Sequence, residues 1–195
     1  MYQHVSEHPI RLFSPQCPDR QREIAGTACG FIDAVKQAVG KLPTGRDDDV
    51  WHIKKLMEAH LAGDVSFVTS FLTLAECVAI EPGQSVVPQE IQEQFRRLLN
   101  SGQYVTLLQQ TPRTAQIAQD LRWRHNLVLA GADALHFAAA IEAGASEFIT
   151  TDERLTKLKV AAAIPALGAI GLRLTNGAAT SCLPDSYRQG ELPDA

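Results

Sequence analysis

The amino-acid sequence predicts a single α/β domain whose central sheet is mostly parallel. The first observation is that short β-rich segments alternate along the chain with longer segments of helical periodicity. The second is that 195 residues, 45% of them hydrophobic, suffice for one compact core, and no internal repeat divides the chain. We therefore expect a three-layer α/β/α sandwich with helices on both faces of the sheet.

The N-terminal part of the chain predicts little regular structure. Residues 1–25 are polar, contain three prolines and show neither helical nor strand periodicity, so we expect an irregular arm. An amphipathic pattern over residues 31–40 predicts a helix. The triplet Asp47-Asp48-Asp49 opens a second helix, which runs to residues 61–63. Acidic residues at a helix start interact favourably with the helix dipole, so capping is the simplest interpretation of this triplet.

The rest of the chain alternates between strands and helices. Strands are expected at residues 65–70, 104–108, 147–150 and 168–175. Helices are expected at residues 72–81, 88–102, 111–124 and 132–143, and from residue 150 onward. The chain after Gly177 is predicted to be irregular. We thus expect one domain at residues 26–187, between an N-terminal arm of residues 1–25 and a tail of residues 188–195.

Charge and cysteine usage narrow the class of protein. The formal net charge of −4 excludes a protein that binds nucleic acid by bulk charge alone, so any such contact needs a local basic patch or bound metal ions. The four cysteines form no CxxC pair and the six histidines no HExxH pattern, which indicates free thiols in a reducing compartment rather than a zinc site. No run approaches the ~20 apolar residues of a membrane span, and the N-terminus lacks the apolar core of a signal peptide. We expect a cytoplasmic protein.

Three acidic residues lie where strands end and helices begin. Glu76 follows the strand at 65–70, Asp133 opens the helix at 132–143, and Asp152 follows the strand at 147–150. In parallel α/β sheets chemistry collects beyond the carboxyl ends of the strands. Each acid also has a structural interpretation, because Thr73-x-x-Glu76 matches a capping box and both aspartates suit helix N-caps.

Asp133 favours the chemical interpretation most strongly. Its helix, ADALHFAAAIEA, is apolar enough to be largely buried, and a buried ionised carboxylate is costly unless it is paired or bound to metal. Carboxylate oxygens suit Mg²⁺ or Mn²⁺, which can activate water and offset the charge of a phosphodiester. We therefore hypothesise a divalent metal site.

The segments around these acids resemble those of PIN-domain nucleases. Residues 69–76, TSFLTLAE, resemble the family's TS-x-LTLAE segment, and residues 133–140, DALHFAAA, resemble its DALHLAAA helix. Residues 144–152 resemble its GA…FLTND strand and turn, and residues 183–187, LPDSY, are similar to the C-terminal ends of bacterial members. The resemblance runs from about residue 29 to residue 187.

This resemblance implies a PIN-like fold and a Mg²⁺- or Mn²⁺-dependent ribonuclease. It further implies the toxin of a VapBC-type pair, a homodimer held inactive by a small antitoxin protein. Carried over to this chain, Glu76, Asp133 and Asp152 would be the metal ligands, and the Thr150 hydroxyl would support the site from its strand end.

One expected carboxylate is absent from the sequence. The family's first strand ends in a metal-binding aspartate, and on our alignment Thr27 stands in that position. Asp33 lies six residues later, within a predicted helix. A hydroxyl is a poorer ligand for Mg²⁺ than a carboxylate, so a catalytically impaired PIN domain acting as a binding module is the alternative hypothesis. The absence of the aspartate is equally explained by a divergent or misassigned first ~26 residues in an otherwise normal domain. A third is an unrelated α/β domain in which all three acids are helix caps.

Other side chains have structural interpretations beside functional ones. His136, one helical turn after Asp133, is expected to be a core residue or a support for the site rather than a general base. Trp51 and Trp123 are expected in the core or at an interface. Most basic side chains are expected on solvated helix faces, with Arg154 the best candidate for an RNA contact; they are Arg96, Arg97, Arg113, Arg122, Arg124, Arg154, Lys157 and Lys159.

Overall fold

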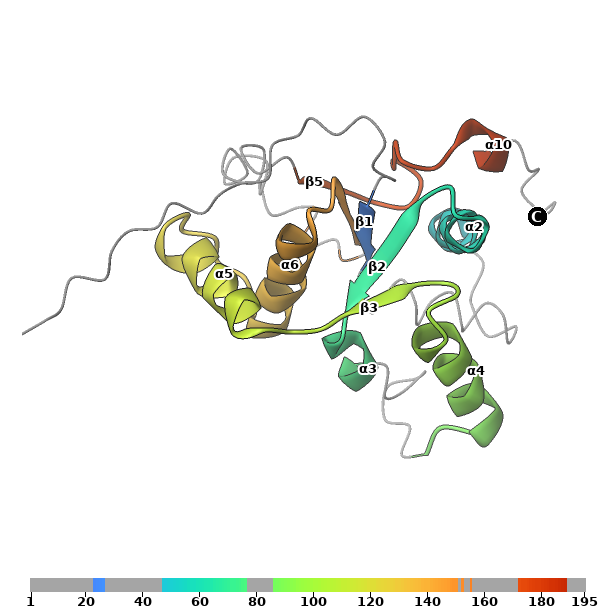
Figure 1. Cartoon of the computed structure of the whole chain (residues 1–195), viewed down its shortest axis with the longest axis horizontal. Coiled ribbons are helices and arrows are strands. Elements are labelled where there is room, and N and C mark those ends of the chain that lie inside the picture. The colour runs from blue at the N-terminus through green and yellow to red at the C-terminus, as the bar shows by residue number, and fades with distance from the viewer. Residues whose placement is uncertain are drawn as a thin grey trace, which may run out of the picture.

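The computed structural model describes residues 23–26, 47–76, 86–150, 152, 155 and 172–188 (Figure 1). Within them the strands are β1 (Glu23–Gly26), β2 (Ser66–Ser70), β3 (Thr106–Leu108), β4 (Glu147–Ile149) and β5 (Arg173–Thr175). The helices are α2 (Asp47–Ala62), α3 (Leu72–Glu76), α4 (Gln89–Asn100), α5 (Pro112–Trp123), α6 (Gly131–Ala143) and α10 (Asp185–Arg188).

The described strands form one parallel sheet in the order β3-β2-β1-β4-β5. β1 lies at the centre, where Ala25 is in register with Val68 on one side and with Phe148 on the other. The chain builds outward from β1 through β2 and β3, and then returns to the opposite side of β1 for β4 and β5. Such a reversal of strand order is where α/β sheets bind ligands, beyond the carboxyl ends of the strands.

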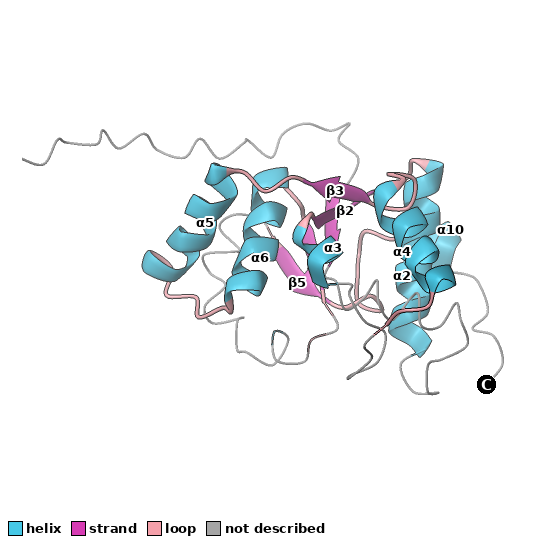
Figure 2. Ribbon diagram, turned by 90° about the horizontal axis from the view of Figure 1, so that it is seen from below, coloured by secondary structure: helices cyan, strands magenta, loops and turns pink. Residues whose placement is uncertain are grey.

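Helices cover both faces of the sheet (Figure 2). Successive side chains of a strand point to opposite faces. Phe67 of β2 and Ile149 of β4 accordingly join the core beneath α2 and α4, whereas their neighbours Val68 and Phe148 join the core beneath α5 and α6. The predicted three-layer sandwich with a parallel sheet is confirmed.

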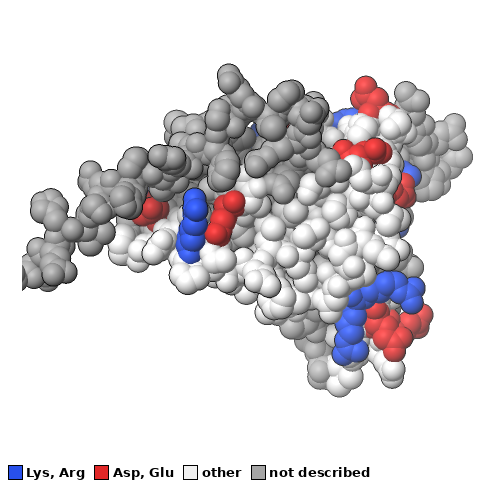
Figure 3. Space-filling model, viewed as in Figure 1, with Lys and Arg blue, Asp and Glu red and all other residues white. Residues whose placement is uncertain are grey.

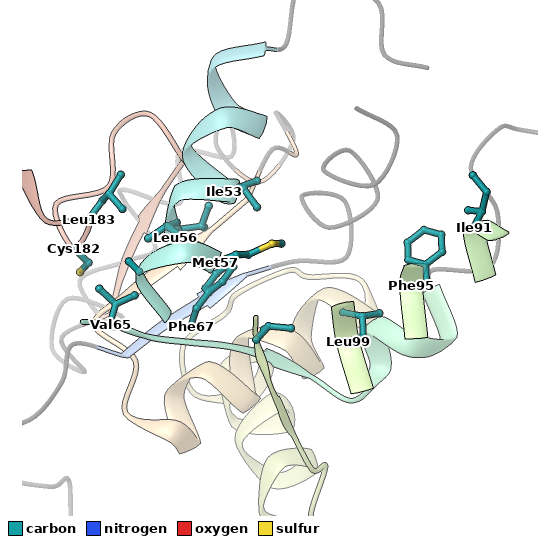
Figure 4. Packing of buried hydrophobic residues seen from close by; sticks show 13 residues of the cluster. Ile53, Leu56, Met57, Val65, Phe67, Ile91, Phe95, Leu99, Cys182 and Leu183 are labelled. Atoms are coloured by element: carbon teal, nitrogen blue, oxygen red, sulfur yellow. The ribbon is translucent and has the colours of Figure 1, made fainter. Parts of the chain in front are cut away.

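The first core lies between the sheet and helices α2 and α4 (Figure 4). Leu56 and Met57 of α2 lie over Phe67 of β2. Ile91, Phe95 and Leu99 recur every four residues along α4, so they form one buried stripe, beside which Leu98 is partly buried.

The second core joins α5 and α6 to the other face. Phe137 of α6 stacks on Phe148 of β4, with ring centroids 4.1 Å apart. Gly144 ends α6 in the left-handed conformation, with φ of 76°, a conformation that glycine adopts without the penalty of a side chain. This tight end brings α6 directly back to β4 and fixes the direction of the helix against the sheet.

Two predictions about the chain ends need correction. Residues 23–25 were assigned to an irregular arm, yet Glu23–Gly26 is the central strand. The segment is short, and its strand conformation depends on hydrogen bonds to β2 and β4, which no local pattern displays. The chain after Gly177 was predicted to be irregular, but Asp185–Arg188 forms the short helix α10. The domain boundaries at residues 26 and 187 stay a prediction.

Several predicted features lie outside the described residues. These include the helix at 31–40, most of the helix after residue 150, and the side chains of Thr27, Asp33, Arg154, Lys157 and Lys159. Among the helices that the structure describes, none has the length and apolar character needed to cross a membrane.

Candidate functional site

The candidate site lies at the carboxyl edge of the sheet, around β1. β2 leads directly into α3, whose last residue is Glu76 (Figure 1). In sequence β4 is followed by Thr150 and then by Asp152. β2 and β4 flank β1 and all three strands are parallel, so their carboxyl ends share one edge. In sequence Thr27 follows Gly26, the last residue of β1.

Glu76 is held by a buried chain of hydrogen bonds. The Nε2 atom of His136 lies 2.7 Å from the Glu76 carboxylate, and the Nδ1 atom of the same ring lies 2.9 Å from the Ser70 hydroxyl. An ionised carboxylate only accepts hydrogen bonds, so Nε2 donates to Glu76, and in the neutral ring Nδ1 accepts from Ser70. Three elements, β2, α3 and α6, are thereby joined at one side chain.

The three residues of this hydrogen-bonded chain differ in how far they are buried. His136 is 4% exposed and Ser70 2%, whereas the Glu76 side chain is 31% exposed. The imidazole and the hydroxyl are therefore enclosed, and the carboxylate that they orient reaches the surface. His136 fits the interpretation of a core residue that supports the site, and Glu76 is the member of the chain that can meet a ligand.

The capping-box interpretation of Thr73 and Glu76 is not supported. Thr73 lies inside α3 rather than before it, is fully buried, and its hydroxyl lies 2.8 Å from the Thr69 hydroxyl. The Glu76 carboxylate contacts His136 on a different helix. This carboxylate therefore connects two helices.

Asp133 occupies the first turn of α6 and is half-buried. The N-cap of α6 is Ala130, so the N-cap interpretation of Asp133 is wrong, although an acid in the first turn still interacts favourably with the helix dipole. Asp133 precedes His136 by three residues, a spacing that places both side chains on one face of the helix. The expected burial holds for residues 136–140, while the helix start is more open.

Thr150 holds the backbone of Asp152. Thr150 is 1% exposed, its N–H donates to the carbonyl of Thr175 on β5, and its hydroxyl accepts a 3.1 Å hydrogen bond from the N–H of Asp152. The Asp152 carbonyl accepts from the N–H of Leu155 at 3.0 Å, which begins a turn at this point. Thr150 thus fixes the main chain that carries the half-buried Asp152.

The donor chemistry of these residues suits a hard divalent cation, since carboxylate oxygens are preferred by Mg²⁺ and Mn²⁺. In the described ranges, no three His, Cys, Asp or Glu side chains lie together as a metal-binding group. Residues 151, 153 and 154, which flank Asp152, are outside the description, as is Thr27. The topology therefore brings Glu76 and Asp152 to one edge, while their role as joint ligands stays a prediction.

Sequence reasoning missed a buried carboxylate, Glu147, at the opposite end of β4. It is 2% exposed and accepts hydrogen bonds from the Arg173 guanidinium, the Thr180 hydroxyl, and the backbone and hydroxyl of Ser181. Burial raises the pKa of Glu147, but the hydrogen bonds from Ser181, Thr180 and Arg173 outweigh it, so the pKa lies below its ordinary value. The cluster anchors the segment after β5 and is remote from the candidate site.

Positive charge is local rather than general. Figure 3 shows Lys and Arg side chains beside Asp and Glu side chains on the face in view, including the region of α4. Arg96, Arg97, Arg113, Arg122 and Arg124 are all exposed, as predicted.

The two tryptophans differ in their surroundings. Trp51 is half-buried on α2, so it fits the expected core or interface position. The core interpretation of Trp123 is wrong, because its side chain is 72% exposed.

The comparison with protein families gives one match. A family model described as the PIN domain matches residues 45–161, which is more than half of the chain and includes Glu76, Asp133 and Asp152. Neither the curated proteins nor the solved structures give a match.

Proposed function

Because the chain belongs to the PIN-domain family, we propose that it is a metal-dependent endoribonuclease that hydrolyses RNA phosphodiester bonds. PIN domains are in general metal-dependent nucleases. Glu76 and Asp152, which follow strands at the carboxyl edge, and Asp133, in the first turn of α6, are the proposed ligands of Mg²⁺ or Mn²⁺. When bound, such an ion supplies positive charge that activates water and offsets the charge of the scissile phosphate.

The observation that carries this proposal is the linkage of Ser70, His136 and Glu76. A buried polar chain that ends in a partly exposed carboxylate is costly to assemble, and a cap or a surface charge would not require it. His136 fixes one oxygen of Glu76 and leaves carboxylate capacity for a ligand. Thr150 makes a similar contribution at the other flank of β1, since it fixes the backbone of Asp152.

The proposal includes a physiological setting. We propose a cytoplasmic toxin of the VapBC type, with RNA as substrate, a small antitoxin protein as partner, and a homodimer as the assembled form. The resemblance of residues 69–76, 133–140 and 144–152 to that group supports this setting.

Thr27 favours a second candidate function. The residue that follows the central strand β1 in sequence is Thr27, where the resemblance implies an aspartate. A site with one carboxylate fewer binds a divalent ion more weakly. A PIN domain impaired in this way would act by binding RNA or protein rather than by cleavage.

Cleavage of a mixed set of labelled RNAs tests the proposal. The protein is assayed with Mn²⁺, with Mg²⁺ and with EDTA, beside Asp133→Asn and the matched control Glu90→Gln. Glu90 is also an acid in the first turn of a helix, α4, so the control removes a comparable dipole interaction away from the site. We expect metal-dependent cutting that Asp133→Asn abolishes and Glu90→Gln retains. Absence of cutting under every condition would favour the impaired domain, and cutting by Asp133→Asn at the wild-type rate would reject the assigned site.

A further inference from the structure

The C-terminal end of α5 presents an exposed tryptophan among basic side chains. Residues 122–125 read Arg-Trp-Arg-His and all four are exposed; we call them the α5-end surface. Trp123 is 72% exposed, although a tryptophan ring usually buries most of its area in a folded domain. Some partner that covers the ring would therefore gain substantial apolar burial.

Buried residues hold the α5-end surface in place at both of its ends. The side chains on either side of it, Leu121 and Leu127, are 2% and 4% exposed and belong to the core beneath α5 and α6. The N–H of Leu127 donates to the carbonyl of Leu121 at 2.9 Å, and Asn126 adopts a positive φ of 51°, which reverses the chain. The four exposed residues thus lie between two buried residues, Leu121 and Leu127, that anchor the segment to the core.

The basic side chains of the α5-end surface favour a polyanionic ligand. Among the described residues Arg122 forms no ion pair, and Arg124 pairs with Asp120 at 3.2 Å while its side chain stays 68% exposed. An ion pair so exposed to solvent holds its partners weakly. In a chain of net charge −4, two arginines and a histidine within the four exposed residues 122–125 are a local concentration of basic side chains.

We propose that the α5-end surface binds single-stranded RNA. Trp123 stacks on a base, and Arg122 and Arg124 contact the neighbouring phosphates, the combination by which proteins bind single strands without reading sequence. This inference rests on the proposed function, because it assigns part of the substrate contact of the same protein. Residues 126–130 connect this surface to α6, whose first turn carries Asp133, and α5 packs against α6.

A second copy of the chain is the competing occupant. Subunit interfaces bury a contiguous apolar area. Of the exposed large hydrophobic side chains in the described ranges, Val128 alone is close to Trp123 in the chain, and the residues on either side of Trp123 in sequence are arginines. RNA is therefore favoured over self-association.

The test is binding of a short, unstructured, end-labelled RNA to the full chain, followed by fluorescence anisotropy in EDTA. Under these conditions neither metal nor cleavage contributes. We expect Trp123→Ala to weaken binding about tenfold or more, and Arg122→Ala with Arg124→Ala to lower the salt dependence of the affinity. The matched control, Arg96→Ala with Arg97→Ala, removes an exposed arginine pair on α4 and leaves the affinity unchanged.

A second readout reports stacking directly. The chain has two tryptophans, so Trp51→Phe leaves Trp123 as the single indole, and RNA should quench its fluorescence. Wild-type affinity in Trp123→Ala, or no RNA binding by the wild-type protein, overturns the inference. A shift of oligomeric state in Trp123→Ala with unchanged RNA affinity overturns it in favour of a second copy. Binding through Trp123 without any cleavage would leave this inference standing and remove the proposed catalysis alone.

Discussion

The Nε2 atom of His136 lies 2.7 Å from the carboxylate of Glu76, although 60 residues separate the two in the chain. The imidazole is buried and the carboxylate is partly exposed, so the histidine acts on a ligand only through the glutamate. It is a positioning residue for the proposed metal site.

Removing this imidazole should loosen Glu76. We predict that His136→Ala lowers Mn²⁺ affinity about 10- to 100-fold, the usual effect of losing a group that orients a metal ligand. His136→Gln keeps an N–H donor and should recover part of the affinity. Isothermal titration measures both, and thermal unfolding shows whether each variant is folded. A folded His136→Ala protein with wild-type Mn²⁺ affinity would contradict the assigned role.

Thr150 offers a matched pair of substitutions on the other flank of β1. Thr150→Val keeps the shape but leaves the N–H of Asp152 without its hydroxyl acceptor, at a cost of about 1–3 kcal/mol. We predict a lower melting temperature and weaker Mn²⁺ binding. Thr150→Ser restores the hydroxyl and should recover both. Equal Mn²⁺ affinity in the valine and serine variants would show that this hydrogen bond does not serve the site.

Thr27→Asp should strengthen metal binding. The substitution adds a carboxylate at the residue that follows the central strand β1 in sequence. We predict an Mn²⁺ affinity at least about tenfold higher than that of the wild-type protein, because carboxylates are far better ligands than hydroxyls for such ions. RNA cleavage should rise with it. An unchanged affinity would mean that Thr27 does not stand where the missing aspartate belongs.

Glu147 should make the fold sensitive to acid. Its folded pKa lies below the ordinary 4.5, so the ionised form stabilises the native state. That contribution is complete above pH 4.5 and is lost as the pH falls below it toward the folded pKa. Glu147→Gln should lower the free energy of unfolding by about 1–3 kcal/mol at neutral pH, because a neutral amide cannot accept all the hydrogen bonds that Thr180 and Ser181 donate to the buried carboxylate.

Urea unfolding at a series of pH values separates this effect from general acid denaturation. The gap between wild type and Glu147→Gln should narrow below pH 4.5. Asp185→Asn is the control, since its exposed carboxylate makes only a long 3.7 Å contact with Arg188. A gap that stays constant down to the lowest pH would contradict the lowered pKa.

Local patterns in the sequence predicted most of the fold. The segments of α4, α5 and α6 show helical periodicity with clear start and stop residues, and β2 and β4 are β-rich, so each could be recognised from its neighbours in the chain. β1 could not, because Glu23–Gly26 is a strand through its pairing with β2 and β4.

The site was predictable only in part, for the same physical reason. Glu76, Asp133 and Asp152 stand at strand ends and helix starts, which the sequence displays. The bond between Ser70 and His136 joins residues 66 positions apart, and Trp123 lies on a helix whose exposed side could not be assigned from periodicity alone. The bond between Ser70 and His136 follows from the packing of α6 on β2, which no local motif displays.

Mn²⁺ titration of the wild-type protein and of Glu76→Gln, Asp133→Asn and Asp152→Asn tests the central claim most directly. Glu90→Gln serves as the control. If the three acids hold one ion at the carboxyl edge of the sheet, each single substitution should greatly weaken the same binding event, and the control should not. Retention of wild-type Mn²⁺ affinity in all three variants would contradict the assignment of this edge as a metal-dependent nuclease site.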